Sequence, residues 1–139
     1  MDTLAWIAIV VGCAAAVDDL RRRAVSNWIS GTGIAGGLIY HTVRHGFRGL
    51  GLAAAGAAIG FAIFLVCYWM GGMGGGDLKL MAAFGAILGP AGIFTAALLA
   101  SIIGASIAAG SLMLDRRKRT IPYAPAIVLG AWLALLGGK

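Results

Sequence analysis

The sequence predicts an all-α membrane protein with six transmembrane helices and no soluble domain. Hydrophobic residues make up 60% of its 139 residues and charged residues only 12%, whereas an ordinary soluble domain carries about 25% charged residues. So few polar groups cannot cover a globular surface, and lipid must therefore face much of the chain. The apolar stretches are continuous, unlike the alternating segments of about ten residues that are typical of a β-barrel. We expect one six-helix domain over residues 1–139.

Charged or glycine-rich breaks separate the first three predicted helices. Span 3–17 ends at a run of aspartates and arginines, and span 24–43 carries no formal charge before a basic loop. Span 50–70 has 21 uncharged residues and ends at a glycine-rich stretch. About 20 apolar residues suffice to cross a bilayer, so these segments predict three crossings.

Three further helices follow the glycine-rich stretch. The longest uncharged run has 35 residues and would overshoot a bilayer as one helix. Gly89 and Pro90 break it, because proline disfavours helix continuation and glycine permits a turn. The resulting spans are 78–88 and 91–114, and the sixth is 121–136. The fourth span rises only about 16 Å against about 30 Å of hydrocarbon, so either it is tilted or it begins below the membrane surface.

The basic residues predict the orientation. Six spans place both termini on one side and divide the 11 Lys and Arg residues into eight on one face and three on the other. The eight-residue face is expected to be cytoplasmic and both termini to lie outside. We therefore attribute the net charge of +6 to membrane topology rather than to nucleic-acid binding. The eight residues are Arg21, Arg22, Arg23, Lys79, Arg116, Arg117, Lys118 and Arg119.

Three aspartates are the candidate functional residues. Asp77 follows the glycine-rich stretch after the third span, and Asp18 and Asp19 follow the first. Odd-numbered spans run in the same direction, so all three lie at one membrane face. An aspartic protease needs two carboxyl groups that share a proton, and bare glycine backbone beside one of them leaves room for an extended substrate. Neighbouring helix positions differ by about 100°, so only one of the adjacent aspartates can face Asp77, and the residues alone do not choose.

The same residues allow other interpretations. The first two aspartates could be a neutralised juxtamembrane cluster, and Asp77 could cap the fourth helix. The cysteines lie inside apolar runs and the two histidines fall on the outer face, so neither a metal site nor a nucleophilic cysteine is expected. The alternative function is a small membrane transporter or channel subunit with Asp77 as its proton or ion site. A membrane assembly factor without activity is a third possibility.

Three segments resemble the type IV prepilin peptidases, which carry a GxGD motif. The segment Gly74 to Asp77 matches that motif, and Leu78 to Met81 matches its continuation. The segment from Asp19 to Asn27 is similar to the first aspartate segment of the family, with Val-Ser where Ile-Pro is usual. The same spacing counted from Asp18 is one residue too long. Residues 121–125 resemble the motif of the final span.

The resemblance implies an aspartic endopeptidase of the inner membrane with its active site at the cytoplasmic side. It implies that Asp19 and Asp77 are catalytic, that no metal or cofactor is used, and that the basic leader of a prepilin or pseudopilin is the substrate. Longer members also methylate the new N-terminus and carry paired CxxC motifs. This chain has no CxxC motif, so the short, peptidase-only type without methyltransferase activity is expected. The expected substrate-binding residues are Gly74, Gly75, Gly76 and Asn27.

Overall fold

The computed structural model describes residues 2–71, 73–114 and 123–138 of the chain. This part is all-α and contains no strand, as the sequence predicts. Three of its helices are long and apolar enough to cross a membrane by length and composition, and the fourth is shorter. The helices are α1 (Thr3–Arg22), α2 (Asn27–Trp69), α3 (Gly75–Leu114) and α4 (Ala124–Gly137).

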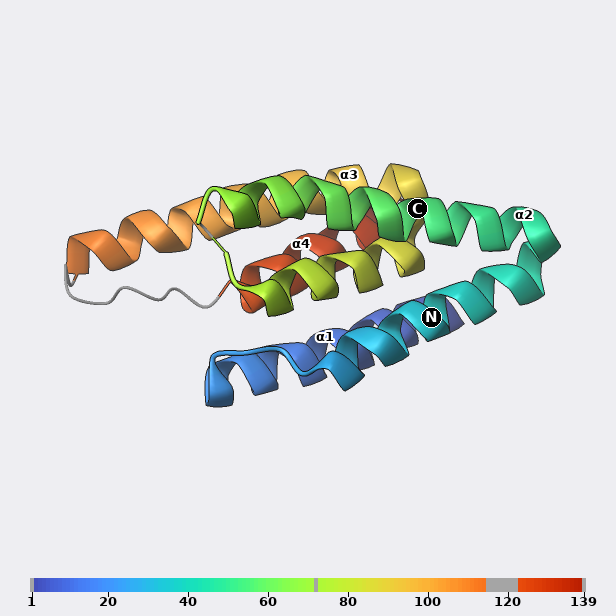
Figure 1. The fold of residues 1–139 in the computed structure, drawn as a ribbon, viewed down its shortest axis with the longest axis horizontal. Helices are drawn as coiled ribbons and strands as arrows, with labels where there is room; N and C mark the ends of the chain where they lie inside the picture. The colour runs from blue at the N-terminus through green and yellow to red at the C-terminus, as the bar shows by residue number, and fades with distance from the viewer. Residues whose placement is uncertain (1, 72, 115–122, 139) are drawn as a thin grey trace.

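The prediction of six separate helices is not reproduced, because two pairs of predicted spans each form one bent helix. The bend in α2 is at Gly46 (φ 60°, ψ −145°), and the bend in α3 is at Gly89 (φ 72°, ψ −178°). A positive φ costs glycine nothing, so a single residue reverses the chain and the helix resumes at once. Figure 1 shows both helices folding back on themselves. Pro90 directly follows the second bend, where its missing N–H costs little.

The helix ends also differ from the predicted spans. α1 continues past residue 17 through both aspartates and ends at Arg22, and the residue that follows, Arg23, has a left-handed backbone (φ 52°). α2 starts at Asn27 rather than at residue 24, and α3 starts at Gly75 rather than at residue 78. Both candidate carboxylates of the dyad therefore lie in helical turns. The predicted charged loop 115–119 and the first two residues of the sixth span lie outside the described residues.

The first half of α3 is the centre of the molecule. Figure 1 shows it surrounded by α1, α2, α4 and its own second half. Small residues allow this enclosure, because a Cβ at Gly56 would overlap the carbonyl of Gly85. The largest fully buried side chains are Leu80, Met81, Phe84, Ile87, Ile93 and Ile127. Five of these six belong to α3, so the short fourth span is enclosed by protein.

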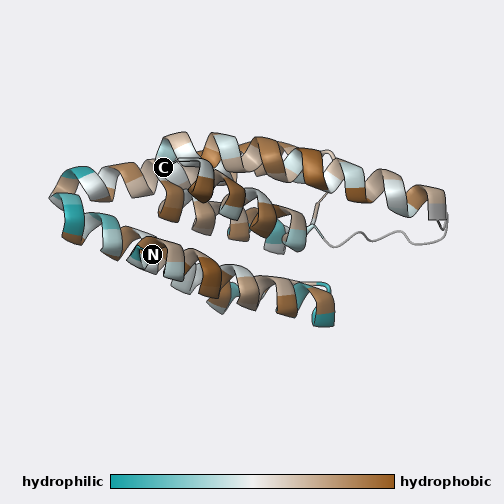
Figure 2. Cartoon of the chain, turned by 180° about the vertical axis from the view of Figure 1, so that it is seen from behind, coloured by the Kyte–Doolittle hydropathy of each residue, from teal (hydrophilic) through white to brown (hydrophobic). Residues whose placement is uncertain are grey.

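The outer surface is largely apolar. Figure 2 shows hydrophobic residues along the helices and hydrophilic ones gathered at the bend of α2 and at the α1–α2 connection, near opposite ends of the molecule. Exposed side chains include Trp28, Val43, Phe47 and Met113. Such a surface suits a chain whose sides face lipid and whose ends face water.

Candidate active site

Asp77 lies in the first turn of α3. Its side chain is buried, with 8% exposed. The backbone N–H of Gly74, just before the helix, donates a hydrogen bond to the Asp77 carboxylate. An acidic residue in the first turn that reaches back in this way pairs with a free N–H group at the helix start, and its negative charge interacts favourably with the helix dipole. The glycine-rich stretch therefore fixes the position of the carboxylate.

Asp19 lies in the last turn of α1 and is also buried, with 6% exposed. Ala124, the first residue of α4, donates its backbone N–H to the Asp19 carboxylate. Within the described residues the Oδ2 atom is buried and has no hydrogen-bond partner. A buried acceptor without a partner is costly and uncommon, so this oxygen is a place where a water or substrate donor can bind.

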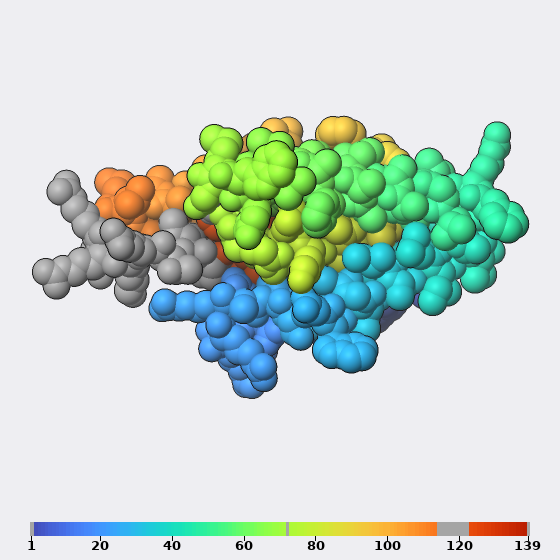
Figure 3. Space-filling view, viewed as in Figure 1, coloured from blue at the N-terminus to red at the C-terminus, as the bar shows by residue number. Residues whose placement is uncertain are grey.

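The two carboxyl groups come together from helices that are distant in sequence. Asp77 and Asp19 are close enough for their charges to interact. Two carboxylates at close range repel, and one shared proton removes the repulsion. In Figure 3 the start of α3 lies between the end of α2 and the α1–α2 connection. The N-terminal turn of α3, the C-terminal turn of α1 and the start of α4 thus form one polar site.

The neighbouring Asp18 has a different task. Its Oδ2 accepts the backbone N–H of Ser26 at 2.8 Å, and its Oδ1 is 3.4 Å from Nε of Arg22. These contacts tie the connection between α1 and α2 to the end of α1. Because adjacent helix positions point about 100° apart, Asp18 shapes the connection while Asp19 faces the site.

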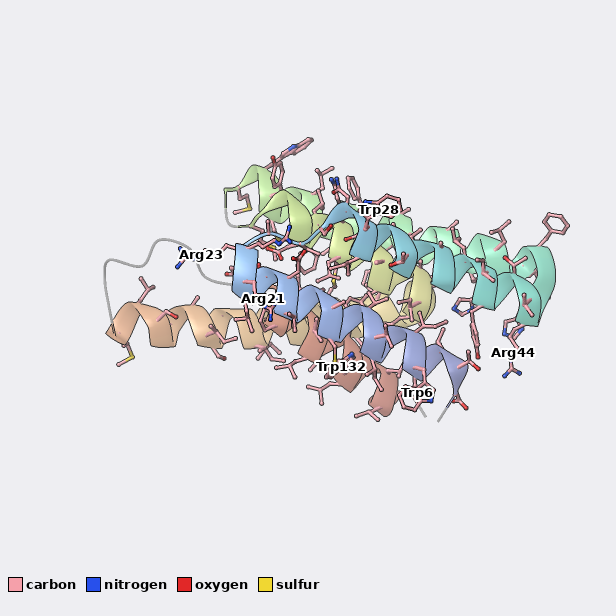
Figure 4. The ribbon with its side chains drawn as sticks, turned by 90° about the horizontal axis from the view of Figure 1, so that it is seen from below. Trp6, Arg21, Arg23, Trp28, Arg44 and Trp132 are labelled. Carbon is pink, nitrogen blue, oxygen red and sulfur yellow. The ribbon has the colours of Figure 1, made fainter. Side chains whose placement is uncertain are left out.

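α4 is held against α1 by Trp132. Its indole Nε1 donates to the carbonyl of Ala8 at 3.1 Å. Gly12 makes room for the ring, because a Cβ there would come within 2.8 Å of Nε1. Figure 4 shows Trp132 alongside α1, and shows Arg21 and Arg23 at the end opposite Arg44. The docking of Trp132 helps to bring the first residue of α4 to Asp19.

The residues expected to bind substrate occupy three kinds of position. Gly74 is open, because a Cβ there would lie 3.8 Å from Oδ2 of Asp77. A Cβ at Gly75 would lie 3.9 Å from the ring of Tyr68, an ordinary contact. A Cβ at Gly76 would lie 2.9 Å from the backbone nitrogen of Val25, so Gly76 packs against the chain itself. The remaining candidate, Asn27, accepts a hydrogen bond from Lys79 on α3.

Two contributions were missed by sequence reasoning. Lys79 donates from Nζ to Oδ1 of Asn27 at 2.7 Å, which joins the starts of α3 and α2. The other is the backbone N–H of Ala124, whose hydrogen bond to Asp19 was not predicted. Pro125 near the start of α4 is the available signal, because proline is common in a first helical turn and marks where free N–H groups lie. Among the described residues there is no cluster of three or more metal-ligating side chains.

The chain matches proteins that process leader peptides. A model of the type IV leader peptidase family matches residues 6–109. A prepilin leader peptidase/N-methyltransferase from Aeromonas hydrophila is 32% identical over 97% of this chain and 48% of the relative. A second protein of that name, from Bacillus subtilis (strain 168), is 37% identical over 63% of this chain and 36% of the relative.

The chain spans about half, or less, of the length of these two curated relatives. No solved structure matches it. The family model covers well over half of the chain and includes both α1 and the start of α3, where the two buried carboxyl groups lie. The chain therefore belongs to the type IV leader peptidase family.

Proposed function

We propose that this chain is a membrane-embedded aspartic endopeptidase in which Asp19 and Asp77 form the catalytic dyad. One observation carries the proposal: two buried carboxyl groups from different helices interact, and one of their oxygens has no partner among the described residues. A helix cap or a neutralised charge cluster explains either residue alone. Neither explains why two acidic groups are buried together, an arrangement that costs free energy and is found mainly at functional sites.

In the proposed reaction one carboxylate accepts a proton from a water molecule, and that water adds to the carbonyl carbon of the scissile peptide bond. The other carboxyl group donates its proton to the carbonyl oxygen. The tetrahedral intermediate then breaks its C–N bond: the amine leaves with the proton of one carboxyl group, and a hydroxyl group of the intermediate gives its proton to the other carboxylate as the new C=O bond forms. Hydrolysis restores the single shared proton, so the pair is ready for another cycle. The N–H groups of Gly74 and Ala124 hold the two carboxylates in position.

The proposed substrate is a prepilin or pseudopilin with a basic leader followed by an apolar helix, in line with the names of the relatives. We propose that the two bends allow six crossings of the inner membrane and that the dyad lies at the cytoplasmic side. The Arg21 and Arg23 end is then cytoplasmic and the Arg44 end is outside. We expect no N-methyltransferase activity from these residues, which contain no CxxC motif.

Single amide substitutions test the dyad. Asp19→Asn and Asp77→Asn keep the side-chain size and remove the acid, so leader removal from a co-expressed prepilin should fall by about 100-fold or more. Asp18→Asn is the matched control, because its amide oxygen can still accept the N–H of Ser26. Cleavage is read from the gel mobility of the pilin at equal membrane levels of enzyme. Full cleavage by either of the first two variants would exclude the dyad.

A further inference from the structure

An apolar cavity of about 260 Å³ lies beside the proposed dyad. It is formed between the end of α2, the second half of α3 and the start of α4, and none of its lining residues in the described part of the chain is acidic or basic. It is smaller than the pockets of about 300–1,000 Å³ that hold small-molecule ligands, which suits one side chain. The residues that line it are Phe64, Cys67, Met70, Met73, Ala100, Ser101, Ala105, Tyr123 and Ile127.

Two lining residues connect this cavity to both carboxyl groups. Tyr123 immediately precedes Ala124, whose N–H binds Asp19. Met73 immediately precedes Gly74, whose N–H binds Asp77. Consecutive Cα atoms are about 3.8 Å apart, so the cavity wall begins one residue from each hydrogen bond of the site. A side chain in the cavity therefore belongs to a residue close to the bond that the dyad attacks.

The walls of the cavity are built for apolar contents. Phe64, Ala100 and Ile127 are buried and form a fixed floor. The hydroxyl of Ser101 donates to the carbonyl of Ala97 at 2.7 Å, so its proton is already used within its own helix. The absence of a side chain at Gly104 leaves room for the Tyr123 ring, because a Cβ there would lie 2.7 Å from Cε1 of the ring.

The rim adds adaptability. Met70 is 81% exposed, and Met73 and Cys67 are partly buried. Methionine is flexible and polarizable, so it fits apolar side chains of differing shape. A rim of this kind, above a fixed floor, accepts several large apolar residues and gives no partner to a charged one. A charged side chain would lose its hydration without compensation.

We propose that this cavity is a specificity subsite that holds the apolar side chain immediately C-terminal to the scissile bond. The inference rests on the proposed function. The leader side of that substrate is basic, and the described lining residues offer a basic side chain no counter-charge. The other side begins the apolar helix, and its first side chain matches the lining in chemistry. The subsite thus sets which residue can begin the processed pilin.

Filling the cavity tests the subsite. Ala105→Phe places a ring at a lining position, and Ala109→Phe is the matched control one turn further along α3, where the residue is also exposed but lines no part of the cavity. Two prepilins are compared, with Phe or Ala directly after the cleavage point. Wild-type enzyme should prefer Phe. Ala105→Phe should lower that preference by about tenfold or more, and Ala109→Phe should keep it.

The outcomes separate the two proposals. If wild-type enzyme cleaves neither prepilin, the proposed function fails and the subsite fails with it. If wild-type enzyme cleaves and both variants keep its preference, the subsite is excluded while the peptidase stands. If Ala105→Phe cleaves neither prepilin, the subsite is tested instead by a measurement that needs no bulky substitution.

That measurement uses the native thiols in detergent-solubilised Asp77→Asn protein. Cys67 lines the cavity, and Cys13 is an exposed cysteine on α1. Two single-cysteine forms, made with Cys13→Ser or Cys67→Ser, are labelled with a maleimide. A peptide with a basic leader followed by an apolar segment that begins with Phe should slow labelling of Cys67 by about tenfold and leave that of Cys13 unchanged. If the peptide does not slow the labelling of Cys67, the subsite is overturned. The same holds if Cys67 is unreactive because lipid or detergent fills the cavity.

Discussion

At the scale of single residues, the site depends on two adjacent aspartates whose side chains point in different directions. Asp18 and Asp19 are adjacent, yet one ties down a connection and the other faces Asp77. Sequence reasoning identified the aspartates from their positions at the ends of apolar spans. It could not choose between the first two, because the direction of a helical side chain depends on how the helix is rotated against its neighbours. The family resemblance chose Asp19, and the geometry places that residue at Asp77.

The glycine-rich stretch shows the same limit. Its residues were expected to leave room for substrate, but Gly76 packs against Val25, which is distant in sequence. No local pattern reports such a contact. The sequence therefore predicted a glycine-rich backbone beside Asp77. Which glycine is open and which one packs against another segment follows only from the folded chain.

Gly76→Ala should destabilise the protein, since its Cβ would lie 2.9 Å from a backbone nitrogen that cannot move aside alone. Overpacking of this kind costs about 1–3 kcal/mol of unfolding free energy. Gly75→Ala is the matched control, with a nearest contact of 3.9 Å. Thermal unfolding in detergent, followed by tryptophan fluorescence, gives both values. Equal melting temperatures for the two variants would contradict the contact.

At the scale of elements, the central position of the first half of α3 determines the site. The sequence predicted a short fourth span and left open whether it is tilted or sunken. The sequence could not reveal that protein surrounds this span, because an apolar run has the same composition whether lipid or other helices cover it. The enclosure explains why Asp77, at the start of that helix, is buried.

α4 is the shortest helix, and its docking should be sensitive to one hydrogen bond. Trp132→Phe removes the donor to the Ala8 carbonyl and should lower the unfolding free energy by about 1 kcal/mol. Cleavage should fall as well, because the N–H of Ala124 then holds Asp19 less firmly. Trp6→Phe, at a residue 56% exposed, serves as the control. Calorimetry and the prepilin assay check both effects, and a Trp132→Phe protein as stable as the control would contradict this role.

At the scale of the whole molecule, the all-α class and the break at Gly89 were predictable from composition and from one Gly-Pro pair. The helix count was not, because the predicted break after the second span is reduced to one residue with a non-helical backbone, Gly46, at which α2 folds back on itself. Asp2 and Gly138 line one cavity, so the start of α1 and the end of α4 lie together. This arrangement suits an even number of crossings.

Cysteine accessibility should show the two ends on opposite sides of the membrane. In a background with Cys13→Ser and Cys67→Ser, Arg44→Cys should react with an impermeant maleimide added to intact cells. Arg21→Cys should react only in inverted vesicles. Both arginines are exposed and lie at opposite ends of the molecule (Figure 4). Labelling of both from the same side would refute the six-crossing topology.

The Oδ2 atom of Asp19, which has no hydrogen-bond partner among the described residues, has a consequence for folding as well as for chemistry. A buried acceptor that lacks a donor lowers stability, and any bound molecule that supplies one repays part of that cost. A substrate that donates a hydrogen bond to this oxygen should therefore raise the stability of the protein as well as enter the reaction.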